Sequence, residues 1–327
     1  MFGYRHLFFL LILVQLACKS NNSIQKEVTP QLEYFNQLIE QSPFVDSLYF
    51  ARATYYYDQN SYDEAIKDLS YAIRLDSLQA RYFHLLADCY MEQGNSYEGL
   101  STMVKAGILF PTRIPTLLKL SEYQNLLKQE SKSLATINRI LTLNPLESEA
   151  HFMAGINYRD LGDTAQAITS FKKATTYDDH LIDAWIILSQ LVQFTDPVYA
   201  RQCIENALRV DSTNTQTLHS YAEFFHESDP LLALSTYHKI ILLDPAYKDA
   251  FLNSGILYFS IDSFAQALQH FDIACYQSPT EPTYYYYRGI AKEAMNDIEG
   301  ARSDYNQALQ LDANYTEAKK ALEKLGQ

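Results

Sequence analysis

A spacing of 34 residues organises almost the whole chain. Gly255 and Gly289 are 34 residues apart, and each is followed twelve residues later by an alanine and four residues after that by an aromatic residue. Three segments share this pattern: Gly155, Ala167 and Phe171; Gly255, Ala267 and Phe271; and Gly289, Ala301 and Tyr305. Small residues let two backbones approach closely, and an aromatic ring fills the space beside them. The pattern therefore predicts a repeated pair of closely packed helices.

This pattern resembles the tetratricopeptide repeat (TPR), a helix–turn–helix unit that stacks into a solenoid. The resemblance implies an all-α, right-handed α-solenoid of about eighteen helices, formed by eight repeats. Their predicted bounds are 46–79, 80–113, 114–147, 148–181, 182–214, 215–247, 248–281 and 282–315. Residues 30–45 are expected to form a half-repeat helix before the first repeat, and 316–327 a capping helix after the last. Such caps cover the stacking face that a terminal repeat exposes.

Proline and aspartate mark the turns of the array. Leu-Asn-Pro at 143–145 and Leu-Asp-Pro at 243–245 close two repeats, because proline disfavours helix in the residue before it. The repeats at 182–214 and 215–247 are one residue short. In both, Asp-Pro (196–197 and 229–230) replaces the glycine-containing turn around Gly162. Aspartate as the N-cap with proline as the first helical residue is expected to start the second helix there.

The N-terminal segment is different in character. Residues 7–14 are an apolar run, too short to span a bilayer comfortably, which favours a signal peptide at 1–17. Ala17 and Cys18 after this run resemble a bacterial lipoprotein cleavage site, which implies acylation of Cys18 and a polar tether at 18–29. The predicted location is the bacterial cell envelope, with a lipoprotein on the outer membrane facing the periplasm. Ordinary secretion as a soluble periplasmic protein is the alternative.

Composition limits the possible partners. The net charge is −13 at pH 7 and the sequence has no basic patch, which argues against binding to nucleic acid or directly to anionic lipid. Cys89, Cys203 and Cys275 fall in repeats that are not neighbours, so neither a disulfide framework nor a cysteine metal site is expected. They are interpreted as small buried apolar residues.

Motifs of catalysis are scarce. The sequence has no glycine-rich phosphate loop, nucleophile elbow or zinc-ligand spacing of cysteines and histidines. His219, Glu223 and His226 have the spacing of one helix face, as metal ligands sometimes do. A fourth ligand and supporting contacts cannot be located, so these residues are interpreted as a polar, ligand-contacting surface. No metal and no cofactor are predicted, and a metal-dependent enzyme built on these residues is the third hypothesis for function.

In proteins of this kind the first helix of every repeat lines a concave face that binds partners. The resemblance assigns these residues to that face: Phe152, Ile156, Ile186, Gln190, His219, Glu223, His226, Leu252, Ile256, Phe259, Tyr286 and Ile290. Leu252, Ile256 and Phe259 form an apolar stripe beside the packing stripe that their helix already has. A helix that is apolar on two faces is either buried on both or offers one to a partner. Packing against the next helix is the alternative for this stripe.

These observations predict a non-catalytic scaffold that binds a protein or peptide on its concave face at the bacterial envelope. The alternative is a constitutive structural subunit of an envelope assembly or secretion complex. In that case the contact would be large and permanent, and could use the convex side.

Overall fold

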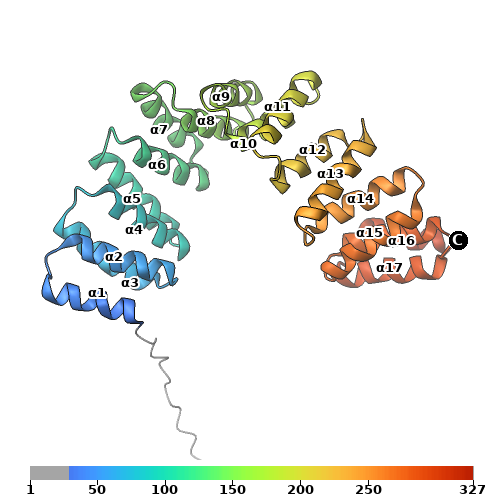
Figure 1. Cartoon of the computed structure of the whole chain (residues 1–327), viewed down its shortest axis with the longest axis horizontal. Coiled ribbons are helices and arrows are strands. Elements are labelled where there is room, and N and C mark those ends of the chain that lie inside the picture. Colours follow the sequence, from blue (N-terminus) through green and yellow to red (C-terminus); the bar gives the residue numbers. More distant parts are fainter. Residues whose placement is uncertain (1–28, 327) are drawn as a thin grey trace, which may run out of the picture. The chain divides into compact units, whose positions relative to one another are not determined.

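The computed structural model describes residues 29–326. Within that range the chain consists of helices joined by short turns and has no β-strand (Figure 1). The helices are α1 (Pro30–Gln41), α2 (Asp46–Asp58), α3 (Tyr62–Leu75), α4 (Ala80–Glu92), α5 (Ser96–Leu109), α6 (Ile114–Leu126), α7 (Glu130–Leu143), α8 (Ser148–Asp160), α9 (Thr164–Tyr177), α10 (Ile182–Val192), α11 (Pro197–Val210), α12 (Thr215–Phe225), α13 (Pro230–Leu243), α14 (Lys248–Ser260), α15 (Phe264–Gln277), α16 (Pro282–Ala294), α17 (Ile298–Leu311) and α18 (Thr316–Leu325). The all-α prediction is confirmed.

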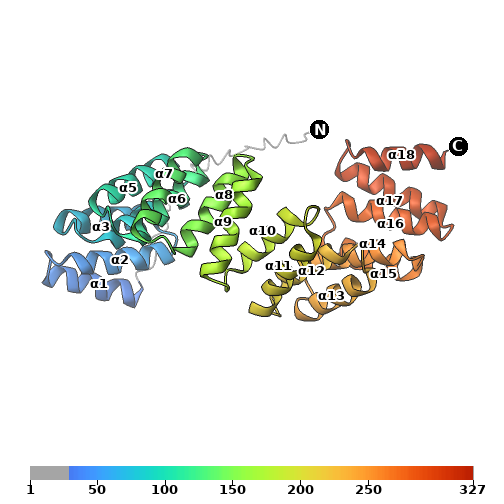
Figure 2. The same cartoon turned by 90° about the horizontal axis from the view of Figure 1, so that it is seen from above.

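The helices alternate as first and second helices of a repeat. The eight even-numbered helices from α2 to α16 begin at the residues where the sequence register begins its eight repeats. Helix α2 and the even-numbered helices from α6 to α16 each pair with the helix that follows in the chain. Helices α14 and α15, and likewise α16 and α17, lie side by side in both views (Figures 1 and 2). The lone helices α1 and α18 lie before the first pair and after the last.

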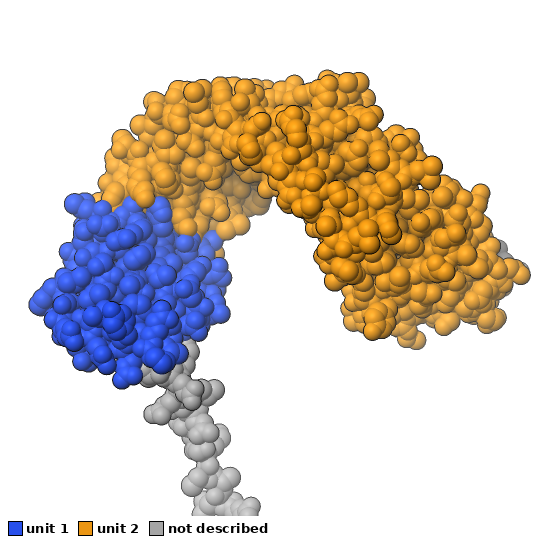
Figure 3. Space-filling view, viewed as in Figure 1, with its two compact units in different colours: residues 1–95 blue, residues 96–327 orange. Residues whose placement is uncertain are grey.

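The chain divides into two compact units (Figure 3). The first unit extends to Asn95 and contains α1 to α4, with a core around Leu69 and Tyr82. The second unit begins at Ser96 and contains α5 to α18. Its apolar cores follow one another along the array instead of merging into one centre. The boundary falls inside the repeat predicted at 80–113, between its two helices.

The close approach predicted from the glycines is present within the repeats of the second unit. A Cβ atom added at Gly155 would lie 2.7 Å from the ring of Phe171, and one at Gly289 would lie 2.6 Å from the ring of Tyr305. At Gly255 the ring of Phe271 would be closer still. The aromatic ring of the second helix therefore rests directly on the backbone of the first, where only glycine fits.

The turn between the two helices repeats its backbone geometry every 34 residues. A residue with positive φ occurs at Asn60 (54°), Gly94 (77°), Lys128 (56°) and Gly162 (79°), and again at Asp262 (59°) and Asn296 (64°). Glycine tolerates this left-handed conformation best, and asparagine and aspartate follow it, so lysine is the unusual residue in the series.

The two short repeats replace this turn. Asp196 accepts a hydrogen bond from the Tyr199 amide, and Asp229 accepts one from the Leu232 amide; proline follows each aspartate at the start of α11 and α13. The capping predicted from Asp-Pro is confirmed. The Asp-Pro turn is one residue shorter than the other turns and needs no residue with a positive φ angle.

The first helices form the more tightly packed side of the array. Helix α2 contacts α4 in the first unit, and in the second unit α6 contacts α8, α10 contacts α12, and α14 contacts α16. No two second helices of the described chain make contacts of that extent. We call the surface formed by the first helices of the second unit the inner face.

Cys89, Cys203 and Cys275 are buried and unpaired, and burial raises the pKa of the Cys203 thiol to about 11.

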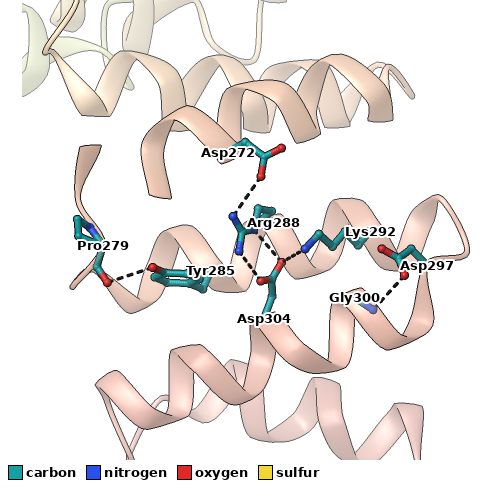
Figure 4. A network of polar contacts seen from close by, with 8 residues as sticks. All are labelled: Asp272, Pro279, Tyr285, Arg288, Lys292, Asp297, Gly300 and Asp304. Atoms are coloured by element: carbon teal, nitrogen blue, oxygen red, sulfur yellow. Dashed lines mark hydrogen bonds and ion pairs between the residues drawn. The ribbon is translucent and has the colours of Figure 1, made fainter. Parts of the chain in front are cut away.

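A buried ion pair links three helices at the last repeat (Figure 4). The Arg288 guanidinium donates to both carboxylate oxygens of Asp304, at 2.9 and 2.6 Å, and to Asp272 at 3.1 Å. The Lys292 ammonium lies 2.8 Å from the same Asp304 carboxylate, which is almost completely buried. These contacts join α16 to α17 within one repeat and to α15 of the repeat before it.

The first repeat carries the same arrangement. The Arg52 guanidinium donates to both carboxylate oxygens of Asp68, at 2.7 Å each, and to Asn36 of α1 at 2.6 Å. Arg52 and Arg288 occupy the same place in their repeats, as do Asp68 and Asp304.

Nowhere in residues 29–326 is there a helix long and apolar enough to cross a bilayer.

Replacing Gly255 by leucine should destabilise the repeats around α14, because the side chain would collide with the ring of Phe271. Overpacking of this kind costs about 1–3 kcal/mol. Contacts in a solenoid are made between neighbours, so hydrogen exchange should rise most in α14 to α17 and least in α6 to α8. Gly326→Leu serves as the control, because a Cβ there would meet only ordinary contacts at 3.6 Å. An unchanged exchange pattern for Gly255→Leu would show that the two helices are not in close contact.

Replacing Arg288 by alanine should cost about 1–3 kcal/mol, because the buried Asp304 carboxylate would lose both hydrogen bonds from Arg288 and keep only the contact with Lys292. The double variant Arg288→Ala, Asp304→Ser should be more stable than the single variant. It reproduces the residues that the repeat at 148–181 has in those places, Ala154 and Ser170. Urea unfolding followed by circular dichroism tests both expectations. A double variant that is less stable than the single one would contradict this explanation.

Candidate functional site

The residues expected on the inner face differ in how much surface they offer. Gln190 on α10 is exposed, whereas Phe152 and Ile156 on α8 are half-buried against a core shared by their own repeat and the next. The Phe152 ring packs on Phe171 with centroids 5.7 Å apart. Ile186 is only 8% exposed and belongs to that same core, so it offers almost no surface to a partner.

The apolar stripe of α14 is half-buried. Leu252, Ile256 and Phe259 pack against the core that includes Phe271 of α15 and Ala291 of α16. One side of each residue therefore packs on its neighbours, and the other side remains accessible; binding of a partner there stays a prediction.

Phe259 leads into a cavity between α14, α16 and α18, which we call the Tyr286 cavity. Its volume is about 520 Å³. Phe259, Tyr286 and Ile290 form its apolar floor, and the last two pack on the core around Tyr305. Three residues that the sequence assigned to a binding face thus line one cavity.

Charged side chains form the rim of the Tyr286 cavity. Glu293 accepts a hydrogen bond from the Tyr305 hydroxyl at 2.8 Å and one from the Lys324 ammonium at 2.8 Å. The hydrogen bond from Lys324 is the main reason why the pKa of Glu293 lies below its usual range. Glu317 and Lys320 of α18 complete the rim. The cavity therefore combines an apolar floor with charges of both signs.

The polar face of α12 has a different geometry from a metal site. The His219 Nε2 atom lies 3.1 Å from a carboxylate oxygen of Glu223, and this hydrogen bond lowers the pKa of Glu223. The His219 ring also contacts the rings of Tyr237 and Tyr247. His219 thus orients the Glu223 carboxylate, which is 56% exposed and remains anionic at neutral pH.

The one group of potential metal ligands in the described range lies away from α12, in the turn before α10. Asp178, Asp179 and His180 bring three ligand atoms within 4.8 Å of one another, and Asp179 and His180 are exposed. His219, Glu223 and His226 do not form such a group.

A second cavity lies beside α12, and we call it the Tyr237 cavity. Its volume is about 650 Å³. Glu223 of α12 and His226, the residue that caps its C-terminus, line it together with Asn253 of α14, Tyr237 of α13 and the turn at Phe194. Phe194 is 91% exposed, the highest value of any large apolar residue in the described chain.

A third cavity of about 650 Å³ lies between α6 and α8, and Phe152 is among the residues that line it. Leu118 and Met153 contribute apolar surface, and Glu122 and Glu149 contribute carboxylates. Burial, with the charges of Glu147 and Glu122 nearby, raises the pKa of Glu149.

Several lining residues were not selected from the sequence. Asn253 and Tyr237 lie in the Tyr237 cavity, and Lys320 and Lys324 lie at the rim of the Tyr286 cavity. One signal was available. The aromatic position of the second helix is tyrosine at 237 and 305 but phenylalanine at 171 and 271, and a buried hydroxyl requires a partner.

Comparisons with known proteins agree with this architecture. Two family models, both described as tetratricopeptide repeat, match residues 50–98 and residues 148–180 and 282–315. The chain therefore contains tetratricopeptide repeats, and its fold is that of a TPR solenoid.

Two curated mouse proteins are similar to this chain. Tetratricopeptide repeat protein 16 of Mus musculus is 24% identical over 82% of this chain and 35% of its own length. RNA polymerase II-associated protein 3 of Mus musculus is 31% identical over 38% of this chain and 19% of its own length. The chain thus spans about a third or less of these relatives. A solved tetratricopeptide repeat protein from Parabacteroides merdae superimposes with a TM-score of 0.54 at 16% identity, covering 76% of this chain and 99% of that one.

Proposed function

We propose that this protein is a non-catalytic TPR scaffold that binds a protein or peptide on the inner face of its second unit. The observation that carries the proposal is the Tyr286 cavity. Phe259, Tyr286 and Ile290 come from two different repeats and together present apolar surface that is only half covered by the chain's own packing.

The chemistry of this surface suits a peptide with spaced apolar anchors. An apolar floor with a charged rim is typical of grooves that accept a helix or an extended segment. Aromatic residues often contribute most of the affinity in such interfaces, so Phe259 and Tyr286 are the expected centres of binding. The polar groups of α12 would then contact the backbone or polar side chains of the same partner.

We further propose that the scaffold acts at the bacterial cell envelope, as an outer-membrane lipoprotein facing the periplasm. The support is the apolar run at 7–14 followed by Ala17 and Cys18. These residues lie outside the described range. A soluble periplasmic protein remains the alternative for its location.

One observation favours the alternative function, a structural subunit of an envelope assembly. Leu242 on α13 and Tyr276 on α15 occupy the same place in adjacent repeats and are 71% and 88% exposed. Both lie on second helices, away from the inner face. A permanent partner on the outer side would cover such residues.

Replacing Phe259 by alanine should weaken partner binding by about 1–3 kcal/mol, because an aromatic anchor would be lost from the cavity floor. Its effect on stability should be much smaller than that of Phe271→Ala. Phe271 is fully buried, and its truncation should cost about 3–5 kcal/mol. Thermal unfolding gives the stability difference, and capture of envelope proteins by each purified variant gives the difference in binding.

The same capture experiment separates the two functions. A peptide-binding scaffold should lose its partner in Phe259→Ala and keep it in Tyr276→Ala, with retention that depends on salt. A structural subunit should show the reverse pattern and should co-purify stoichiometrically at every salt concentration. Normal capture by Phe259→Ala would overturn binding at the Tyr286 cavity.

Replacing Cys18 by serine should release the protein from membranes or block its processing, because serine cannot carry the thioether-linked lipid. Fractionation of bacterial cells and mobility on a gel measure both effects. Cys275→Ala is the matched control, since that cysteine is buried in the repeats. Unchanged membrane association and mobility of Cys18→Ser would contradict the lipoprotein proposal.

A further inference from the structure

The cavity between α6 and α8, which we call the Phe152 cavity, is an apolar groove on the inner face. Its lining residues all belong to these two first helices or to the turn before α8. Leu118, Phe152 and Met153 form its floor, and each of them is half-buried. Leu118 and Met153 pack on the core around Ile137, and the Ser121 hydroxyl lies 3.5 Å from the Met153 sulfur. The repeats therefore hold this floor in place and leave one side of it accessible.

Two carboxylates at the edge of the Phe152 cavity have no partner of opposite charge. Glu122 of α6 and Glu149 of α8 line the cavity and are exposed. Within residues 29–326 neither carboxylate accepts a hydrogen bond or forms an ion pair. A third carboxylate in the lining, that of Glu147, accepts a hydrogen bond from the Asn144 side-chain amide at 2.9 Å. The apolar floor thus has an acidic edge that the chain itself leaves available.

The start of helix α8 does not account for these charges. Glu149 lies in the first turn of α8, where a carboxylate normally stabilises the positive end of the helix dipole. The pKa of Glu149 is nevertheless raised, chiefly by burial and then by the charges of Glu147 and Glu122. The ionised carboxylate is therefore less favourable in the folded chain than in the unfolded one, and a cation beside it would reverse this effect.

Charge selects the occupant of the cavity. The single lysine of the lining, Lys119, lies over the ring of Tyr123 at 5.8 Å and faces three carboxylates in the same lining. An acidic side chain would meet these like charges, whereas an ammonium or guanidinium group would be attracted by them. The aliphatic part of a lysine or arginine side chain also suits a floor made of leucine, phenylalanine and methionine.

The corresponding place near the end of the array has different chemistry. Between α14 and α16, Ile256 and Thr283 occupy the places that Glu122 and Glu149 have between α6 and α8. The rim of the Tyr286 cavity carries charges of both signs, and its Glu293 is already paired with a lysine. The two cavities of the inner face therefore suit different residue types.

We propose that the Phe152 cavity binds a basic side chain, lysine or arginine, of the protein or peptide partner. The charged end lies between Glu122 and Glu149, and the aliphatic part packs on Leu118 and Phe152. This inference rests on the proposed peptide-binding function and adds a contact in a different pair of repeats from the Tyr286 cavity.

Selection from a random nonapeptide library displayed on phage tests the occupant. Peptides retained by the full-length protein should be enriched in lysine or arginine beside apolar residues. By fluorescence anisotropy, the double variant Glu122→Gln, Glu149→Gln should bind a selected peptide about tenfold more weakly, because charge-assisted hydrogen bonds would be lost. Norleucine in place of the basic residue should weaken binding to the wild type and remove the difference between the two proteins.

A second double variant controls for the overall charge. Glu98→Gln, Glu299→Gln makes the same change in net charge on exposed positions of the second helices α5 and α17, away from the inner face. It should bind the selected peptide as the wild type does. Selected peptides without basic residues, or equal affinities of the two double variants, would overturn the proposal.

Folding measurements test whether Glu149 serves the fold instead. Glu149→Gln should raise the folding equilibrium constant at pH 7 or leave it unchanged, because the raised pKa means that ionisation opposes folding. Any gain should disappear below about pH 4, where the carboxyl is protonated in both states. Glu299→Gln, also in the first turn of its helix, should lower the constant about twofold or more. An equal fall in Glu149→Gln would show that Glu149 stabilises α8, against its assignment to a guest.

Phe259→Ala separates this proposal from the function on which it depends. If no basic peptides are selected but Phe259→Ala still reduces capture of the envelope partner, the scaffold function holds and the basic-side-chain site is wrong. If basic peptides bind and Phe259→Ala captures normally, the Phe152 cavity is a binding site and the Tyr286 cavity is not. If both fail, the inner face is not the binding surface.

Discussion

The close contact between the two helices of a repeat organises this structure, and in three repeats a glycine of the first helix meets an aromatic ring of the second. Because the ring of Phe171, Phe271 or Tyr305 rests on a backbone without a Cβ atom, the two helices of a repeat are held at one short distance. That distance fixes where the next first helix can pack. Four pairs of first helices contact one another, α2 with α4, α6 with α8, α10 with α12 and α14 with α16, and side chains from neighbouring repeats line cavities beside them.

Much of the fold could be predicted from the sequence because this contact has a strict spacing. The start of every first helix, the close approach at Gly255 and the Asp-Pro caps all follow from local residue types. The positive φ angle of Lys128 could not be predicted in this way, because lysine has no preference for that conformation and only its place in the 34-residue repeat indicates a turn. The boundary between the two compact units, after Asn95, could not be predicted either, because the 34-residue repeat pattern continues across it.

The candidate site was less predictable, because accessibility depends on the neighbours in space. Ile186 has the spacing of an inner-face residue but is covered by the core of its own and the preceding repeat. Tyr237 and Tyr305 occupy equivalent positions in their repeats, yet only the Tyr305 hydroxyl donates a hydrogen bond to an acceptor. The pairing of Arg288 with Asp304 joins residues sixteen apart and follows no helical spacing, so it emerges only when α16 and α17 are packed.

The ion pairs around Arg52 and Arg288 limit which repeats the solenoid can gain or lose. They occur at the first repeat, around Arg52, and at the last, around Arg288, and each reaches back only to the helix immediately before it. The repeats between them have neither arginine nor aspartate in the places of Arg288 and Asp304. Duplicating or deleting one of the repeats between 80 and 247 would therefore leave both terminal charge sets complete. The chain could gain or lose inner-face cavities, and with them partner preferences, while keeping the same two ends.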